Sequence, residues 1–256
     1  SSGFRSPNVD DVGKIREKGG NVTVPNIVLK PEFAYNSEIG VLQYFNNRLF
    51  SVGANVYYTL LNNYIIRAPF DINTQQEGAS EIEYDGEMAK VFANVNRGQA
   101  YIYGGSVNFR GEIDEHWLFR GGVNYTKGKT YDTRENMSSI PPVFGNLGVT
   151  YKIKKFDFDI EYEFNAAKKP SEYNINEGID NIEQTPVVDE NADSEIEKYA
   201  GTPSWELFHF SVFYEVSRDL ELQFRTTNIF DRHYKEFASG ISAPGRNFSA
   251  SVRYLF

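Results

Sequence analysis

The chain has 256 residues, a formal net charge of −9 and a mean hydropathy of −0.49. The acidic balance argues against a nucleic-acid partner, because contact with phosphates requires a basic surface, and no apolar run approaches the roughly 20 residues of a membrane-spanning helix. The absence of cysteine excludes disulfides, zinc–thiolate sites and thiol nucleophiles.

Apolar and polar residues alternate along most of the chain, which is the pattern of β-strands with two different faces. The clearest case runs from Phe156 to Asn165, where aromatic residues and Ile alternate with Asp and Glu. The pattern predicts an all-β protein, and the third strand is expected to be interrupted near residues 94–98. The nine predicted strands, in chain order, are residues 33–45, 48–67, 88–113, 116–130, 142–153, 155–168, 204–217, 219–230 and 246–256.

The connections between these strands alternate between short and long. The long connections are residues 71–87, 130–141, 168–203 and 231–245. In an antiparallel meander, alternate connections lie at opposite ends of the sheet, so all long loops should lie at one rim, as in a transmembrane β-barrel. A soluble β-sandwich also alternates apolar and polar residues, but it has shorter strands and no reason to gather its long loops at one end.

The two faces of the predicted strands differ sharply. Aromatic residues near strand ends, namely Tyr57, Tyr58, Tyr125 and Trp205, are expected to form a girdle at the membrane interface. Charged residues on the opposite face imply a water-filled or plugged interior. Nine strands would leave two unpaired edges in lipid, and bacterial barrels have even strand numbers. We therefore expect the C-terminal part of a larger barrel, with further strands before Ser1.

Four stretches together resemble the C-terminal half of TonB-dependent outer-membrane receptors. GFRSPNVDD followed by VPNIVLKPEFAYNSEIG resembles the FRAP and NPNL-KPE boxes of that family, and VNRGQAYIYGG resembles its mid-barrel strand. SSIPPVFGNLGVTY resembles a proline pair that leads from a loop into a strand. TTNIFDRHYKEFASGISAPGRNFSASVRYLF resembles the ending with N-L-F-D-x-x-Y and P-G-R. The resemblance covers essentially the whole chain.

The resemblance implies a protein of the bacterial outer membrane whose barrel has 22 strands and is closed by an N-terminal plug domain. Residues 1–256 would be the C-terminal part of that barrel, with about nine of its strands, and the plug and N-terminal strands would be absent. The expected partners are membrane lipid, the rest of the barrel, the plug and the TonB complex. Hydration or pairing within the barrel wall is the alternative role for the residues expected to face the plug, which are Arg110, Arg120, Asp157, Glu161 and Arg225.

The implied function is import of a scarce nutrient, with an iron–siderophore or similar metal chelate favoured. The alternatives are uptake of haem or a haemoprotein, cobalamin, or a glycan or peptide with a surface lipoprotein partner, and a barrel subunit without an import role. Family haem receptors usually carry a histidine in the interval from the FRAP to the NPNL box, and residues 8–24 contain none. Candidate ligand contacts in outer loops are Asn8, Asp10, Asp11, Tyr84 and His233.

No catalytic site is expected. Ser204, His209 and Asp231 supply the residue types of a nucleophilic triad, but they lie on different segments without an activating spacing. A barrel enzyme is therefore not favoured.

No resident cofactor or metal is expected either, and calcium is the alternative. Asp189, Asn191, Asp193 and Glu195 alternate as at the start of a calcium-binding loop. The pattern then fails, because Ser194 replaces the turn glycine and Ala200 replaces the bidentate glutamate. A solvated acidic loop is the simpler interpretation.

The last residues, GRNFSASVRYLF, alternate up to an aromatic terminus. This pattern resembles the signal that the outer-membrane insertion machinery reads by strand addition. The predicted signal consists of Phe248, Val252, Tyr254 and Phe256, which should also face lipid.

Deleting Phe256, or replacing it with a charged residue, should impair membrane assembly, because the signal and the lipid contact both end on this side chain. Ligand contacts should be unaffected. Quantitative surface labelling of cells that express the full-length receptor would check this, and normal surface levels of the variant would refute it.

Overall fold

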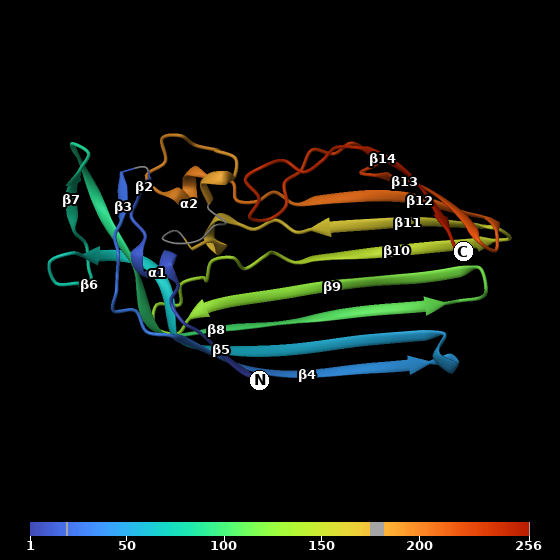
Figure 1. Cartoon of the computed structure of the whole chain (residues 1–256), viewed down its shortest axis with the longest axis horizontal. Coiled ribbons are helices and arrows are strands. Elements are labelled where there is room, and N and C mark those ends of the chain that lie inside the picture. The colour runs from blue at the N-terminus through green and yellow to red at the C-terminus, as the bar shows by residue number, and fades with distance from the viewer. Residues whose placement is uncertain (19, 175–181, 256) are drawn as a thin grey trace.

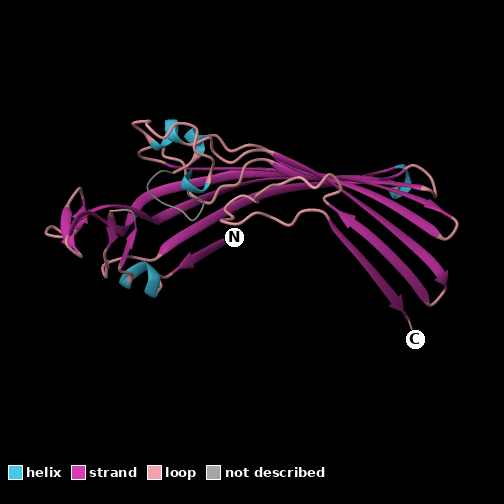
Figure 2. Cartoon of the chain, turned by 90° about the horizontal axis from the view of Figure 1, so that it is seen from above, coloured by secondary structure: helices cyan, strands magenta, loops and turns pink. Residues whose placement is uncertain are grey.

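The computed structural model describes residues 1–18, 20–174 and 182–255, and the side chains of Lys18 and Glu195 are also outside the described set. Long strands lie side by side in one large sheet (Figures 1 and 2). The strands are β1 Ser2–Arg5, β2 Arg16–Lys18, β3 Asn21–Thr23, β4 Glu32–Phe45, β5 Phe50–Asp71, β6 Gln76–Glu77, β7 Glu81–Tyr84, β8 Glu87–Glu112, β9 Trp117–Thr130, β10 Phe144–Ile153, β11 Phe156–Asn165, β12 Trp205–Ser217, β13 Leu220–Thr227 and β14 Asn247–Tyr254.

The main path through the sheet follows the chain, in the order β1-β4-β5-β8-β9-β10-β11-β12-β13-β14, and every pair on it is antiparallel. All nine predicted strands are present, and β1 was missed. Within the described residues β1 and β14 each pair on one side only, so the sheet does not close. The short turns lie at one end of the sheet and the long connections at the other, as predicted (Figure 1).

The helices are short and lie in the connections. They are α1 Val9–Gly13, η1 Asn46–Arg48, η2 Pro170–Glu172, η3 Ile182–Gln184 and α2 Glu195–Lys198. None of the described helices has the length and apolar character needed to cross a membrane.

Strand register gives the sheet two distinct faces, because residues paired across an antiparallel ladder point to the same side. One face, which we call the apolar face, exposes large apolar side chains that favour a lipid environment over water. The opposite side is the polar face. Phe248, Val252 and Tyr254 of the predicted assembly signal lie on the apolar face as expected, and Phe256 lies outside the described residues. Other exposed members of the apolar face are Val56, Tyr58, Tyr103, Val107, Val123, Tyr125, Leu147, Ile160, Leu222 and Phe224.

The predicted interruption near residues 94–98 is wrong, because β8 is continuous from Glu87 to Glu112. The polar side chains in this stretch find partners outside the ladder and do not compete with it. Asn94 Nδ2 donates to Asp11 O at 3.2 Å, and Asn96 Nδ2 donates to Lys30 O at 2.9 Å. Tertiary contacts therefore override the weak strand preference of these residues.

The predicted aromatic girdle is correct for Tyr58 and Tyr125 and wrong for Tyr57 and Trp205. Tyr57 lies on the polar face, where its hydroxyl is 2.7 Å from Thr126 Oγ1. Trp205 pairs with Asn165 on the same polar side. Neighbouring residues of a strand point to opposite faces, so Tyr57 and Tyr58 cannot both face the membrane interface.

β5 and β8 continue past the ends of their neighbours, with 22 and 26 residues, and β5 ends at Asp71 instead of the predicted residue 67. β9 pairs with β8 only as far as Ala100, and farther out β3 pairs with β8 in parallel, with Val22 opposite Val91. β2, β3, β6 and β7 were also missed by the sequence prediction, and three of them lie in this region beside β3. These three strands, β3 and the outer ends of β5 and β8 form a unit that we call the outer extension (Figure 1).

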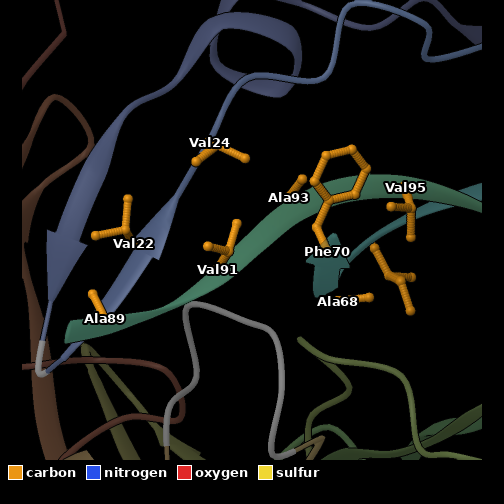
Figure 3. Close-up of a cluster of buried hydrophobic side chains, with 9 residues drawn as sticks. Val22, Val24, Ala68, Phe70, Ala89, Val91, Ala93 and Val95 are labelled. Carbon is orange, nitrogen blue, oxygen red and sulfur yellow. The ribbon is translucent and has the colours of Figure 1, made fainter. Parts of the chain in front are cut away.

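The outer extension has its own hydrophobic core (Figure 3). Every second residue of β3, β5 and β8 points into it, so the same period of two that makes the sheet also makes this core. Val22 and Val91 are each 1% exposed, which indicates close packing. The buried members are Val22, Val24, Ile66, Ala68, Phe70, Ala89, Val91, Ala93 and Val95.

Replacing Val91 with Asp should open the outer extension, because an unpaired buried carboxylate costs several kcal/mol. Limited proteolysis of the full-length protein on intact cells should cut this region at least about tenfold faster than in the unmodified protein. Met88 on the same strand is 63% exposed, so Met88→Asp is a matched control that should resist cleavage. Equal resistance of both variants would contradict the packing.

Candidate functional site

An ion pair on the polar face spans three strands. Arg120 on β9 reaches across β10 and donates from Nη1 and Nη2 to Asp159 on β11 at 2.8 and 2.9 Å. Thr150 Oγ1 adds a hydrogen bond of 2.6 Å to the same carboxylate. Gly148 makes room for the guanidinium, since a Cβ there would lie 2.7 Å from Arg120 Cζ. The planar fork of arginine matches a carboxylate in two parallel bonds, so this pair is held in a fixed geometry.

Other charges of the polar face are also paired, each through a single contact. Arg225 on β13 approaches Glu161 on β11 at 3.4 Å. Arg110 pairs with Glu112 at 2.9 Å, and Asp157 lies 3.7 Å from Lys152.

All five residues predicted to face the plug thus lie on one face, as expected, and each pairs within the wall. The exposed pair of Arg110 and Glu112 adds little stability on its own, whereas the half-buried pair of Arg120 and Asp159 is less screened by water. Contact with a plug stays a prediction for Arg110, Arg120, Asp157, Glu161 and Arg225.

A cavity of about 440 Å³ lies among the long connections β11–β12 and β13–β14 at the outer rim. Trp205, the first residue of β12, packs against Tyr234 with ring centroids 4.8 Å apart. Arg232 and Lys235 add positive charge, Glu236 adds one negative charge, and His233 also lines the cavity. We call this the outer cavity. Its volume and its mixture of aromatic and cationic groups are typical of small-molecule pockets.

Burial changes the pKa of Tyr234, one of the aromatic side chains that line the outer cavity. It raises the pKa of Tyr234, and the carboxylates of Glu236 and Glu163 raise it further. The Tyr234 hydroxyl therefore stays protonated at neutral pH and can donate a hydrogen bond to a ligand.

The base of the β13–β14 connection is closed by Asn228. Its backbone φ of 49° lies in the left-handed region, which Asn adopts more readily than most residues. Asn228 Oδ1 accepts from Arg232 N at 2.8 Å, and Nδ2 donates to Arg232 O at 2.8 Å. Asp231 Oδ1 accepts from Arg246 N at 2.7 Å. These bonds join the two ends of the connection and hold the segment that carries Tyr234.

His209 links this base to the polar face. It is 7% exposed, and its Nδ1 accepts from Asn228 N at 3.2 Å. Its Nε2 lies 3.6 Å from Glu163 Oε2. Among the hydrogen bonds of the described residues, none joins Ser204 to His209 or Asp231. These three residues are therefore not arranged as a catalytic triad in the described part of the chain.

The candidate ligand residues are not gathered at one place. Asn8 and Asp11 form a capping box that starts α1, with both reciprocal bonds at 2.9 Å. Asp10 is exposed on α1, and Tyr84 is exposed on β7. His233 alone of these lines the outer cavity, where its Nε2 is 2.7 Å from Ser242 Oγ. Ligand contact stays a prediction for all five.

The weak calcium pattern has a local explanation. Asp189 Oδ1 accepts from Asn191 N at 2.9 Å, which is an ordinary turn contact. Asp193 is exposed, and the side chain of Glu195 lies outside the described set. Across residues 1–18, 20–174 and 182–255, no group of three or more His, Asp or Glu converges as metal ligands would. The expectation of no resident metal, with calcium as the alternative, stays a prediction.

Sequence reasoning missed most of the outer cavity. Tyr234 is the tyrosine of the quoted N-L-F-D-x-x-Y motif, and Arg232 and Lys235 flank it, so the motif itself was the available signal. Trp205 was assigned to the girdle because it opens a strand. Tyr173 and Thr202, whose side-chain hydroxyls are hydrogen-bonded to each other, gave no sequence signal at all.

Lys127 at the outer end of β9 holds the β11–β12 connection through an ion pair with Glu172. Burial by itself would raise the pKa of Glu172, but the hydrogen bonds from Lys127 and from the backbone N–H of Lys169 outweigh it, and the pKa is lowered from its ordinary 4.5. This ion pair holds Glu172 in place, and the next residue, Tyr173, lines the outer cavity.

Long strands, one apolar and one charged face, and long loops gathered at one rim together define an outer-membrane β-barrel protein. A family model described as "TonB dependent receptor-like, beta-barrel" matches residues 1–229, and the chain belongs to this family. Members of the family are transport receptors of the outer membrane of Gram-negative bacteria that work with TonB and have plug domains.

Individual relatives are distant and much longer. Hemoglobin-binding protein A of Haemophilus influenzae is 24% identical over 100% of this chain and 27% of its own length. Probable hemoglobin and hemoglobin-haptoglobin-binding protein 4 of the same species is also 24% identical, with the same coverage. The ferric enterobactin receptor PfeA of Pseudomonas aeruginosa superposes with a TM-score of 0.69 at 14% identity, over 100% of this chain and 37% of that chain. The chain thus spans 27% of the length of each of these two haemoglobin-binding relatives.

Acid should release Glu172 from Lys127. Because the folded pKa is depressed, the stabilisation is fully present above the unfolded pKa near 4.5 and is lost as pH falls through the lowered folded value. A spin label at Ser171 should therefore become mobile only at a pH below the ordinary pKa of 4.5.

In Lys127→Met the Glu172 carboxyl keeps its burial and loses its cation, so the transition should move to higher pH. Lys154→Met, in a turn at the opposite rim, should leave the transition unchanged. An unchanged transition in Lys127→Met would contradict the assigned contact.

Proposed function

We propose that this chain is the C-terminal part of the barrel of an outer-membrane receptor that takes haem from a haemoprotein and imports it with energy supplied through TonB. Its plug, the remaining strands and the TonB-contacting segment would lie elsewhere in the longer protein. On this proposal the chain has no enzymatic role, and the five paired residues of the polar face lie toward the plug.

The outer cavity is the observation that carries the proposal. Haem is a flat aromatic ring with two carboxylates, so it requires an apolar wall for the ring and cations for the carboxylates. Trp205 and Tyr234 provide the wall, and Arg232 and Lys235 provide the cations at the same cavity. His233 adds an imidazole, the side chain that most often binds haem iron.

Two further observations support a protein as the source of the haem. The relatives named for haemoglobin binding align with the whole chain, including the outer loops. The outer extension also offers a rigid, acidic surface at the outer rim, because Glu81, Glu83, Asp85 and Glu87 surround the β7–β8 turn above a packed core. A pre-organised surface of this kind suits a macromolecular ligand better than it suits a small chelate.

An anionic iron–siderophore chelate is the second candidate, since the same cations and aromatic rings would also fit a catecholate complex. The two candidates differ in the iron source on which the cell can grow. A haem receptor supports growth on haemoglobin as the iron source, whereas a siderophore receptor supports growth on the ferric chelate. A surface lipoprotein that hands over the ligand is compatible with both.

The test uses a strain that carries the full-length receptor as its single haem-uptake system. Growth on haemoglobin should require the receptor, and Arg232→Ala with Lys235→Ala should lower haem uptake at least about a hundredfold, because each of the two charge-assisted bonds contributes roughly 1.5–3 kcal/mol. Arg218→Ala, in the short turn at the opposite rim, should leave uptake unchanged. Growth on a ferric siderophore alone, with haemoglobin use independent of the receptor, would overturn the proposal in favour of the second candidate.

A further inference from the structure

Five tyrosines gather where the apolar face meets the outer rim. Tyr58, Tyr101 and Tyr103 come from neighbouring positions of β5 and β8, with ring centroids of Tyr58 and Tyr101 6.0 Å apart. Tyr131, from the β9–β10 connection, packs on Tyr101 at 4.9 Å and is hydrogen-bonded to the Tyr58 hydroxyl. Tyr125 on β9 completes the group at 6.3 Å from Tyr103. We call this the outer tyrosine cluster.

Two cations lie against the outer tyrosine cluster. Lys129 is opposite Tyr101 in the β8–β9 ladder and lies on the same face. The Arg134 guanidinium lies 5.9 Å from the ring centroids of both Tyr101 and Tyr131, and its Nη1 donates to the Tyr101 hydroxyl at 3.1 Å. Arg134 has a φ of 59°, a left-handed conformation that is unfavourable for arginine, so the contact is made despite backbone strain.

Within the described residues, neither of these cations has a carboxylate partner. Two other basic side chains at the same rim are paired, because Arg97 contacts Glu77 at 2.5 Å and Glu135 at 2.7 Å, and Lys127 pairs with Glu172. The other acidic residue of this segment, Asp132, is exposed, and its Oδ1 accepts from Thr133 N at 2.8 Å.

The depth of the site in the membrane follows from the order of side chains along β9. On the apolar face of β9, Val123, Tyr125, Lys127 and Lys129 succeed one another toward the outer rim. Each step of two residues rises about 6.6 Å along the strand. This order matches the environments that a strand crosses as it leaves a membrane. The apolar residue suits the hydrocarbon, the aromatic ring suits the interface, and the cations suit the charged headgroups. Lys129 and Arg134 therefore lie at headgroup depth.

We propose that Lys129, Arg134 and the outer tyrosine cluster bind a phosphate group on the headgroup of a glycolipid in the outer leaflet. Arginine binds phosphate through its planar fork, lysine acts as a point charge, and tyrosine hydroxyls supply neutral donors. The aromatic rings would cover the first part of the lipid, as interfacial tyrosines do. This site lies on the apolar face, whereas Trp205 of the outer cavity lies on the polar face, so it is separate from the proposed ligand site.

The test measures binding of phosphorylated lipid A, and of lipid A with its phosphates removed, to the full-length receptor in detergent by native mass spectrometry. The phosphorylated lipid should bind at least about tenfold more tightly, and Lys129→Ala with Arg134→Ala should remove that preference. Inorganic phosphate at the same concentration should not displace the lipid, which separates a headgroup site from a site for free phosphate.

The matched control is Arg48→Ala, because Arg48 also has a positive φ and lies 5.6 Å from the ring centroid of Tyr44, but at the opposite rim. This variant should keep the preference for the phosphorylated lipid. Heat-modifiable migration on gels should show that all variants are folded barrels.

A folded double variant that keeps the preference would overturn the proposal, as would equal binding of the two lipids by the unmodified receptor. Displacement by inorganic phosphate, or binding of an acidic soluble protein in place of the lipid, would overturn it as well. Because none of these measurements involves haem or haemoglobin, the outcome is independent of the proposed function.

Discussion

The backbone hydrogen-bond ladder is the constraint on which the rest of this structure depends. In hydrocarbon an unpaired N–H or C=O costs several kcal/mol, so a spanning strand requires a partner on each edge. From β4 to β13, every long strand has such partners in an unbroken antiparallel order. The same ladder then sets the register, and the register determines which side chains meet lipid and which meet the interior. The apolar face and the paired charges of the polar face are both consequences of one set of backbone bonds.

Beyond the membrane the chain uses a different source of stability. β5 and β8 leave their neighbours behind and would carry unsatisfied edges and exposed apolar residues, but β3 and β7 pair with β8 there and a packed core forms around Val91. Water can satisfy open backbone groups in this region, so the driving force is burial of apolar side chains. The outer extension is therefore a small packed unit built on the ends of two long strands.

The outer cavity depends on loops that are fastened to the ladder at a few points. Asn228, Asp231 and Arg246 join the ends of one connection, and Lys127 holds the other through Glu172. His209 connects the first of these points to the polar face through Asn228. Loops fixed in this way can carry binding groups without long segments of regular structure, which is how rigid scaffolds usually present functional loops.

The sequence by itself determined the nine long strands, their antiparallel order and the rim at which the long loops lie. A period of two and the lengths of connections are local properties, and local properties can be read from one chain. Only the tertiary structure decided that β8 continues through Asn94, that Tyr57 and Tyr58 point to opposite environments, and that Trp205 meets Tyr234 across two connections. The same is true of the pairing of Arg120 with Asp159 over Gly148. Each of these features depends on register or on contacts between distant segments, and such contacts arise only when the whole sheet has formed.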